Sequence, residues 1–236
     1  MSATHLNIKP VSAFSENNGV KGILYGSPGS GKTPILCSAP TPIVFLIEPG
    51  TLSVRDRDDV AGYAPRTVKE IDDCIDWVME SKEAKQFESF CFDSLSEMAA
   101  VKLQEIQAKS PSMHGLQQYG KAGEWAIKHA RRLYYAPKCN IFFNAKQDTS
   151  IDGRGMMNPS YIGKMLPVEV PHLFDIVFHV EKINVTIDGR LEERPAFRTK
   201  ETAGCQFSCR DRSGALDEFE PADLTYIVEK IKKAVK

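Results

Sequence analysis

The chain has 236 residues, of which 42% are hydrophobic and 26% charged, the composition of an ordinary soluble globular protein. The formal net charge is -1, so no global positive field indicates a nucleic-acid partner, and DNA binding would need a local basic patch or an assembled surface. The chain lacks an apolar run near the ~20 residues that span a bilayer and has no charged-then-apolar leader, so we expect a cytoplasmic protein with no membrane partner.

The first element along the chain, residues 1–19, is polar and irregular, and we interpret it as a lead-in strand or loop. After it come short apolar runs, each near-continuous and rich in β-branched or aromatic side chains. Such runs predict strands that are buried on both faces of a sheet. The runs are residues 20–25, 43–47, 87–92, 140–144 and 174–180.

Helical patterns lie between these runs. Thr67 is followed by Glu70 in the spacing of a capping box, which predicts the start of a helix. Ser94 or Ser96 would open the next helix. Two further helices are predicted at about residues 116–135 and 222–235.

One antiparallel element follows the last apolar run. Residues 181–199 predict a hairpin with a tight turn at Asp188-Gly189. The alternation of strands and helices before it predicts βαβ units. We therefore expect one α/β domain over residues 1–236, with a mainly parallel sheet flanked by helices and a hairpin extending that sheet.

The six cysteines are scattered, and most lie inside apolar runs. Only Cys205 and Cys209 are close in sequence, and no second Cys/His pair at zinc-ligand spacing accompanies them. We interpret all six as free thiols, which suits a reducing compartment.

A phosphate-binding pattern follows the first predicted strand. Residues 26–33 match G-x-x-x-x-G-K-[ST] at every defined position, and a helix-compatible stretch begins at Lys32. Glycines let backbone amides turn toward an anion, Lys32 brings a charge to the β- and γ-phosphates, and Thr33 offers a hydroxyl to Mg²⁺. Pro34 suits the first helical turn. The predicted nucleotide-binding residues are Gly26, Ser27, Pro28, Gly29, Ser30, Gly31, Lys32, Thr33 and Pro34.

A second magnesium anchor is expected at the end of a neighbouring buried strand. Asp93 closes the run 87–92 and has the position of a Walker-B aspartate, so Thr33 and Asp93 are the predicted metal ligands. The alternative is that Asp93 is the N-cap of the following helix. The residue after Asp93 is Ser94, where oligomeric AAA-type ATPases commonly carry the catalytic glutamate, so that role must fall elsewhere.

Residues 24–33, the strand that ends in Asp93-Ser94 and the strand end at Asn144–Gln147 resemble the phage RecA-like P-loop nucleotide-binding proteins. This AAA/RecA-type group includes core-only ATPases that assist single-strand annealing in phage recombination. The closing segment, 211–224, resembles the same family, so that the similarity spans about residues 20 to 230. The resemblance implies a RecA-like P-loop NTPase core, with ATP and Mg²⁺ as ligands.

The resemblance also implies roles for residues at other strand ends. Glu48 ends the second strand, where RecA-like proteins carry the base that orients the attacking water; the alternative is an ordinary strand-end carboxylate. Asn144 and Gln147 follow a strand that would lie between the phosphate-loop strand and the Asp93 strand, and either would sense the γ-phosphate. The alternative is that Asn144 and Gln147 are ordinary polar surface residues that follow a strand. The implied catalytic residues are Lys32, Glu48, Asn144 and Gln147.

Residues 148–171 occupy the place of the DNA-contacting loop in RecA-like proteins, and we interpret them as a mobile loop. Arg154 and Lys164 would meet phosphates and Tyr161 would stack on a base. A plain active-site lid explains the same composition. In RecA-like proteins a basic residue completes the site from across a subunit interface. The candidates for this role are Lys200, Arg210 and Arg212, and the alternative is that they are ordinary solvated charges on the surface.

The resemblance therefore implies a Mg²⁺-dependent ATPase that acts on single-stranded DNA in recombination, annealing or repair. It would self-associate into an oligomer or filament and work with a single-stranded-DNA-binding protein, in the bacterial host cytoplasm if it is phage-encoded. One alternative is a nucleotide-dependent assembly switch without a DNA role. Another is a P-loop small-molecule kinase, which the single arginine of residues 148–171 disfavours.

Overall fold

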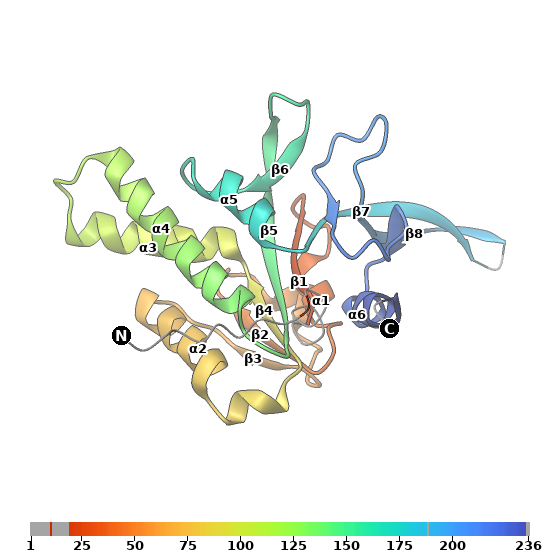
Figure 1. The fold of residues 1–236 in the computed structure, drawn as a ribbon, viewed down its shortest axis with the longest axis horizontal. Coiled ribbons are helices and arrows are strands. Elements are labelled where there is room, and N and C mark those ends of the chain that lie inside the picture. The colour runs from red at the N-terminus through yellow and green to blue at the C-terminus, as the bar shows by residue number, and fades with distance from the viewer. Residues whose placement is uncertain (1–9, 11–18, 188, 235–236) are drawn as a thin grey trace.

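The computed structural model describes Pro10, residues 19–187 and residues 189–234 of the chain. The predicted lead-in segment lies outside the described residues apart from Pro10 and Gly19, and so does Asp188 of the predicted turn. Within the described part, strands and helices alternate around one large sheet (Figure 1). The strands are β1 Lys21–Gly26, β2 Pro42–Leu46, β3 Ala61–Tyr63, β4 Ser89–Asp93, β5 Asn140–Ile151, β6 Met157–Ser160, β7 Ile176–Ile187, β8 Arg190–Arg198, β9 Arg210–Asp211 and β10 Phe219–Pro221.

The helices connect these strands and cover both faces of the sheet. They are α1 Lys32–Leu36, α2 Val68–Glu80, α3 Leu95–Lys109, α4 Gly115–Tyr134, α5 Leu166–Leu173 and α6 Leu224–Ala234, with 3₁₀ turns η2 Thr51–Val54 and η3 Glu83–Gln86. One hydrophobic cluster packs α2, α3, α4 and α5 on one face, and a second packs α1 and α6 on the other. This is the expected α/β fold, a mostly parallel sheet flanked by helices, consistent with a RecA-like P-loop NTPase.

The strand order places the candidate site at the centre of the sheet. The path is β10-β8-β7-β1-β5-β4-β2-β3, with β6 paired to β5 and β9 to β7. Strand β5 therefore lies between the phosphate-loop strand β1 and the Asp93 strand β4, as the RecA-like order requires. Parallel pairing of β1, β5, β4 and β2 brings their carboxyl ends to one edge of the sheet.

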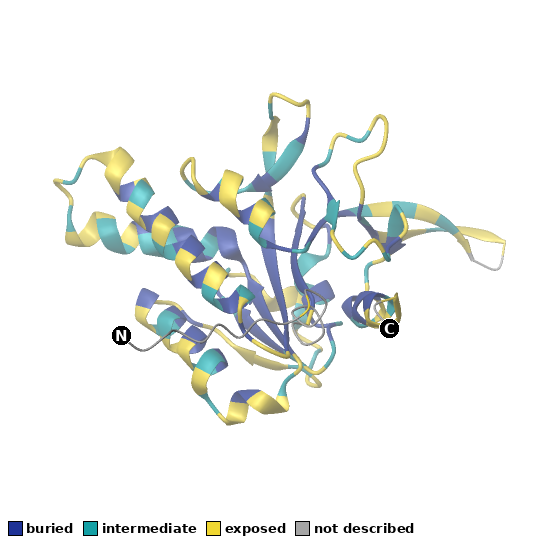
Figure 2. Ribbon diagram, in the orientation of Figure 1, coloured by how far each residue is buried: buried dark blue, intermediate teal, exposed yellow. Residues whose placement is uncertain are grey.

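Continuous apolar runs form the central strands because both faces of the sheet are covered. Strands β1 and β4 are buried along their whole length, and Figure 2 shows the central strands as the most buried part of the fold. The outer part of the β7–β8 hairpin extends away from this core and is largely exposed. Its antiparallel register runs from His179↔Arg198 to Ile187↔Arg190, so the predicted hairpin is confirmed.

The predicted helix starts agree closely with the structure. Thr67 accepts a hydrogen bond from the backbone N–H of Glu70, whose carboxylate bonds back to the N–H of Thr67, so the capping box is confirmed. Ser94 is the N-cap of α3, and it accepts from the backbone N–H of Glu97 at 3.2 Å. The interpretation of Asp93 as that N-cap is therefore wrong.

The interpretation of residues 148–171 as a loop is also wrong. Strand β5 continues to Ile151 and turns back as β6, with Lys146 opposite Ser160 and Ile151 opposite Met157, and α5 follows. Backbone hydrogen bonds between β5 and β6 make this segment a hairpin, although its side chains are mostly polar. Strands β3, β9 and β10 were also not predicted, because each is only two or three residues long.

Candidate active site

The phosphate loop leaves β1 at Gly26 and enters α1 at Lys32. A Cβ on Gly26 would lie 2.7 Å from the carbonyl oxygen of Val180 on β7, so only glycine fits this close approach of two strands. Gly29 and Gly31 have φ of 79° and 91°, the left-handed region that favours glycine, with open space around each. The loop glycines therefore meet two different requirements, one steric and one conformational.

Lys32 lies over this loop. Its ammonium donates hydrogen bonds to the carbonyl oxygens of Gly26 at 2.8 Å and Ser27 at 3.0 Å. Burial lowers the pKa of Lys32, and the negative charges of Glu48 and Asp93 partly oppose that effect. The structure thus brings Lys32, Glu48 and Asp93 from separate elements into electrostatic contact.

Asp93 lies at the end of β4, buried between two hydrogen-bond donors. The hydroxyl of Thr33 donates to Oδ2 at 2.6 Å, and the amide nitrogen of Asn144 donates to Oδ1 at 3.1 Å. The carboxylate therefore points toward the phosphate loop. Neighbouring parallel strands β5 and β4 carry Asn144 and Asp93, and α1 carries Thr33 to the same edge.

The donor set fits a magnesium ion bound together with phosphate. Mg²⁺ is usually held by one or two carboxylates plus phosphate oxygens and water, not by a cage of protein ligands alone. Asp93 and Thr33 supply a carboxylate and a hydroxyl whose oxygens already lie 2.6 Å apart. The buried side-chain oxygen of Asn144 has no hydrogen-bond partner among the described residues, which leaves a further acceptor beside them.

Glu48 lies beside this cluster, just beyond β2. Its backbone N–H donates to the carbonyl oxygen of Asp93 at 2.7 Å, so the end of β2 is joined to the end of β4. Arg66 donates to the carbonyl oxygens of Leu46 and Ile47 at 3.0 and 3.1 Å and holds the same turn. The Glu48 carboxylate forms an ion pair with Lys146 at 3.6 Å.

Asn144 and Gln147 lie on opposite faces of β5. Phe142 belongs to the cluster on the α1 side and Phe143 to the cluster on the other side, so alternation places Asn144 toward α1 and Gln147 away from it. Gln147 donates to the sulfur of Met157 at 3.3 Å, and its oxygen lies 3.2 Å from Nε2 of His179. Of the two predicted γ-phosphate sensors, the structure brings only Asn144 into the Asp93 cluster.

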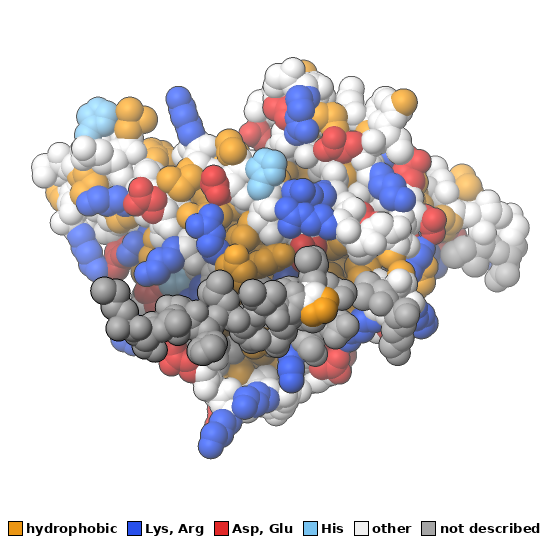
Figure 3. Space-filling model, in the orientation of Figure 1, with side chains coloured by type: hydrophobic (Ala, Val, Ile, Leu, Met, Phe, Trp, Pro, Cys, Tyr) orange, Lys and Arg blue, Asp and Glu red, His pale blue; other side chains and the backbone are white. Residues whose placement is uncertain are grey.

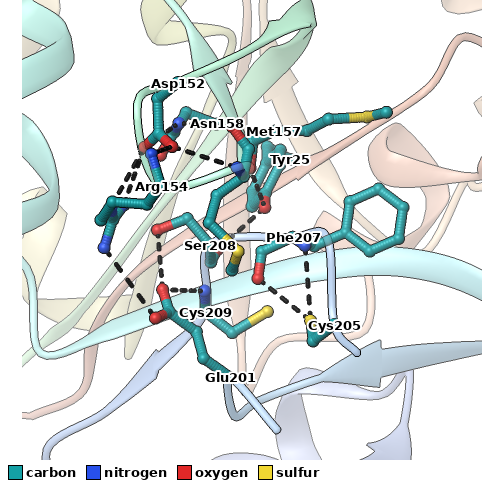
Figure 4. A network of polar contacts seen from close by, with 11 residues as sticks. Tyr25, Asp152, Arg154, Met157, Asn158, Glu201, Cys205, Phe207, Ser208 and Cys209 are labelled. Atoms are coloured by element: carbon teal, nitrogen blue, oxygen red, sulfur yellow. Dashed lines mark hydrogen bonds and ion pairs between the residues drawn. The ribbon is translucent and has the colours of Figure 1, made fainter. Parts of the chain in front are cut away.

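The predicted DNA-contacting residues lie in the β5–β6 hairpin and the turn before α5. Arg154 is bonded to Asp152 at 3.1 Å and faces Glu201 at 3.9 Å, as Figure 4 shows. Lys164 is exposed. Tyr161 packs against the hydrophobic core as a partly buried residue, and its hydroxyl is buried, which disfavours base stacking; a contact with DNA stays a prediction.

Figure 4 also shows how this hairpin is joined to the phosphate-loop strand. The Tyr25 hydroxyl donates to the carbonyl oxygens of Met157 at 3.1 Å and Ser208 at 2.8 Å. Glu201 accepts from the Ser208 hydroxyl at 3.1 Å and from the Cys209 N–H at 3.2 Å. Tyr25, the residue before Gly26, thus bonds both to strand β6 of the hairpin and to the segment that carries Ser208.

The three basic residues proposed to act across an interface differ in their surroundings. Arg210 donates to the carbonyl oxygen of Pro171 at 2.9 Å, and Arg212 donates to that of His172 at 2.6 Å. Both therefore cap the carboxyl end of α5 within their own chain. Lys200 is exposed at the end of β8. A role for any of them in a neighbouring subunit stays a prediction.

Sequence reasoning missed two residues of this region, Lys146 and His179. Lys146 pairs with Glu97 at 2.9 Å as well as with Glu48, and a strand reading of residues 140–146 would have placed it on the same face as Asn144. His179 is stacked on Phe207, with ring centroids 3.5 Å apart, and is buried beside Tyr25 and Gln147. No local sequence signal distinguishes this histidine from an ordinary strand residue.

The surface shows no segregation of charge on the side drawn in Figure 3. Lysine and arginine side chains are interspersed with aspartate and glutamate over the uncovered part of this face. All six cysteines are free thiols, as predicted. Among the residues that the structure describes, no helix is long and apolar enough to cross a lipid bilayer.

Comparison with known proteins identifies the family of this chain. A family model described as an AAA domain matches residues 18–205. No curated protein matches the chain. Among solved structures, the flagellar accessory protein FlaH from Methanocaldococcus jannaschii is similar, with 13% sequence identity and a TM-score of 0.40, over 81% of this chain and 83% of that chain.

Proposed function

This chain belongs to the AAA domain family, and from that premise we propose that it is a Mg²⁺-dependent ATPase. The observation that carries the proposal is the position of the Asp93 carboxylate, held by Thr33 at 2.6 Å and by Asn144 at 3.1 Å beside the phosphate loop. A P-loop lysine, a hydroxyl and a buried carboxylate are the groups that nucleotide hydrolysis requires at one site.

The residues divide the work as follows. The amides of residues 26–33 and the ammonium of Lys32 bind the phosphates and stabilise the charge on the transferring phosphoryl group. Thr33 and Asp93 hold Mg²⁺, which when bound offsets the charge on the phosphate oxygens. Glu48 orients the attacking water and accepts its proton; the support for this role is its position just beyond β2, where its backbone N–H bonds to the carbonyl oxygen of Asp93 at 2.7 Å. Asn144 holds Asp93 in place.

We also propose that the ATPase is of the phage RecA-like type, that it self-associates, and that its polymer ligand is single-stranded DNA. The resemblance of residues 24–33, Asp93-Ser94 and 144–147 supports this assignment. Arg154 lies on the hairpin that continues β5 beyond Asn144, and its side chain is more than half exposed. A phosphate there would compete with Asp152 for the Arg154 guanidinium, exchanging one charge-assisted bond for another.

Steady-state ATP hydrolysis, with and without single-stranded DNA, tests the proposal in the original chain, Lys32→Ala and Glu48→Gln. We expect turnover that DNA stimulates and both substitutions abolish, while Glu48→Gln still binds ATP. A rate of ATP hydrolysis that single-stranded DNA does not change would contradict the DNA role. Nucleotide-dependent oligomerisation without turnover would favour an assembly switch, and phosphate transfer to a small acceptor would favour a kinase.

A further inference from the structure

The side chain of Lys146 lies between two carboxylates at the edge of the candidate site. Its ammonium is 2.9 Å from Glu97 on α3 and 3.6 Å from Glu48 beyond β2. In the sheet register Lys146 is the partner of Gly26, the first residue of the phosphate loop. The Lys146 ammonium therefore links the candidate base, Glu48, to β5, the strand that pairs with β1 at the start of the phosphate loop.

The backbone of this turn is fixed, whereas the Glu48 carboxylate has few partners. Hydrogen bonds from Arg66 and to Asp93 hold the main chain from Leu46 to Glu48. Among the described residues, the Glu48 carboxylate has Lys146, at 3.6 Å, as its one ion-pair partner, and it accepts no hydrogen bond. Pro49 and Gly50 follow, and Gly50 is exposed with φ of 119°. The position of this carboxylate thus depends on Lys146.

Lys146 itself is anchored twice to the first turn of α3. Its backbone N–H donates to the Ser96 hydroxyl at 3.0 Å, and its ammonium donates to Glu97. Burial opposes the charge, but the hydrogen bond to Glu97 and the negative charge of Glu48 raise the pKa of Lys146, so it stays an ammonium at neutral pH. The Glu97 side chain is 20% exposed and the Glu48 side chain 32% exposed, so water screens this cluster only in part.

We propose that Lys146 is a positioning residue for ATP hydrolysis, which holds the Glu48 carboxylate in place for the attacking water through its anchor on Glu97. This inference rests on the proposed function, because it takes Glu48 as the base. An ordinary half-exposed ion pair would contribute little to stability and nothing to the rate. A positioning pair instead affects the rate, because a misplacement of about 1 Å at a reacting group costs roughly a hundredfold.

The test is a double-mutant cycle in single-turnover ATP hydrolysis, a format that measures slow rates, with the original chain, Lys146→Met, Glu48→Gln and the double variant. We expect Lys146→Met to slow hydrolysis about ten- to a hundredfold, with the Kd for ATP changed less than about threefold. In the Glu48→Gln background, Lys146→Met should have no further effect. Lys146→Arg, which keeps the charge, should recover most of the rate.

Matched variants separate this role from a structural one. Lys109→Met breaks a comparable Lys–Glu pair on α3, with Glu105 at 2.6 Å, and should leave the rate unchanged. Glu97→Gln removes the charge that holds the Lys146 ammonium, with little change of shape, and should slow hydrolysis several-fold. If Lys146→Met does not fold, Glu97→Gln replaces it in the test. The role of Lys146 is overturned if Lys146→Met slows hydrolysis by the same factor in the Glu48→Gln background as in the original chain. It is also overturned if the loss of rate is explained by a weaker Kd for ATP. A Glu48→Gln variant that hydrolyses ATP at the original rate instead overturns the proposed base.

Discussion

The hydroxyl of Thr33 donates a hydrogen bond to the carboxylate of Asp93 at 2.6 Å, which joins the first turn of α1 to the end of β4. Since Asp93 also accepts from Asn144, both of its oxygens are oriented before any ligand arrives. Preorganised ligands of this kind lose little entropy when a metal binds.

Asp93→Asn is expected to abolish the effect of magnesium. The amide cannot supply the negative charge that a divalent cation requires, so hydrolysis should fall by about a hundredfold or more. ATP affinity measured in EDTA should stay within about threefold of the original chain, because the loop and Lys32 remain. Titration of a fluorescent ATP analogue with and without Mg²⁺ checks this, and a magnesium-dependent gain in affinity equal to that of the original chain would contradict it.

Gly26→Ala is expected to disrupt the phosphate loop. The added Cβ would lie 2.7 Å from the backbone oxygen of Val180 and 2.9 Å from the Ser30 hydroxyl, so one of two paired strands must shift. We expect a loss of about 1–3 kcal/mol in unfolding free energy and at least a tenfold weaker Kd for ATP. Gly153→Ala is the control, because nothing lies within 4 Å of its Cβ position. Equal behaviour of the two variants would show that β1 and β7 are not so closely packed.

His179 is expected to make stability depend on pH. Burial, with smaller contributions from the charges of Arg198 and Lys32, lowers the pKa of His179 from 6.5 to about 4. The folded protein then binds fewer protons than the unfolded chain between these pH values, so the contribution is complete above pH 6.5 and is lost as pH falls toward 4. The loss is at most about 3 kcal/mol. Urea unfolding at several pH values should show a shallower dependence in His179→Gln, and identical slopes would contradict the assignment.

Tyr161 is expected to behave as a core residue. Its hydroxyl is buried without a hydrogen-bond partner among the described residues, and burial strongly raises its pKa. Tyr161→Phe should therefore be neutral or stabilising by up to about 1 kcal/mol, while Tyr161→Ala should lose about 3–5 kcal/mol. Thermal unfolding distinguishes this from a surface residue that stacks on DNA, for which Tyr161→Ala would change DNA affinity and leave the melting temperature alone.

The capping box at Thr67 is expected to contribute about 1 kcal/mol to stability. Thr67→Ala leaves the backbone N–H of Glu70 without its side-chain acceptor, which costs ~0.5–2 kcal/mol in other helices. Thr67→Ser keeps the hydroxyl and should recover most of the loss. Chemical unfolding of the three proteins measures the difference, and equal midpoints for Thr67→Ala and the original chain would contradict the role of the cap.

The central part of the site could be predicted because its signals are local. Residues 26–33 carry a continuous motif, and Asp93 directly follows an apolar run, so no long-range information was needed. The helix start at Thr67 was also predicted from neighbouring side chains, and that of α3 was narrowed to Ser94 or Ser96. Both helix caps depend on hydrogen bonds between residues that are close in sequence.

Features that depend on tertiary packing could not be predicted in the same way. The β5–β6 hairpin has a polar sequence around Gly153 and Gly155, and it is held by backbone bonds that leave no hydrophobic pattern. Helix α5 contains Pro171 in its interior, which argues against a helix in a sequence pattern, whereas Pro167 lies in the first turn, where proline is tolerated. The side of the sheet on which Gln147 lies could not be predicted, because Gln147 was expected to follow the strand and not to belong to it. On a strand, the alternation of side chains determines that side.

The position of β1 in the sheet also determines when the site can form during synthesis. Gly22 pairs with Phe142 of β5 on one side and Ile176 of β7 on the other, both more than a hundred residues later in the chain. Loops of that length must close before these pairings return any stability, and folds dominated by such contacts form slowly. A ribosome will therefore have synthesised the phosphate loop long before its supporting strands exist. Until Ile176 emerges, the apolar residues of β1 are exposed to chaperones and to aggregation, and the nascent chain should not retain ATP.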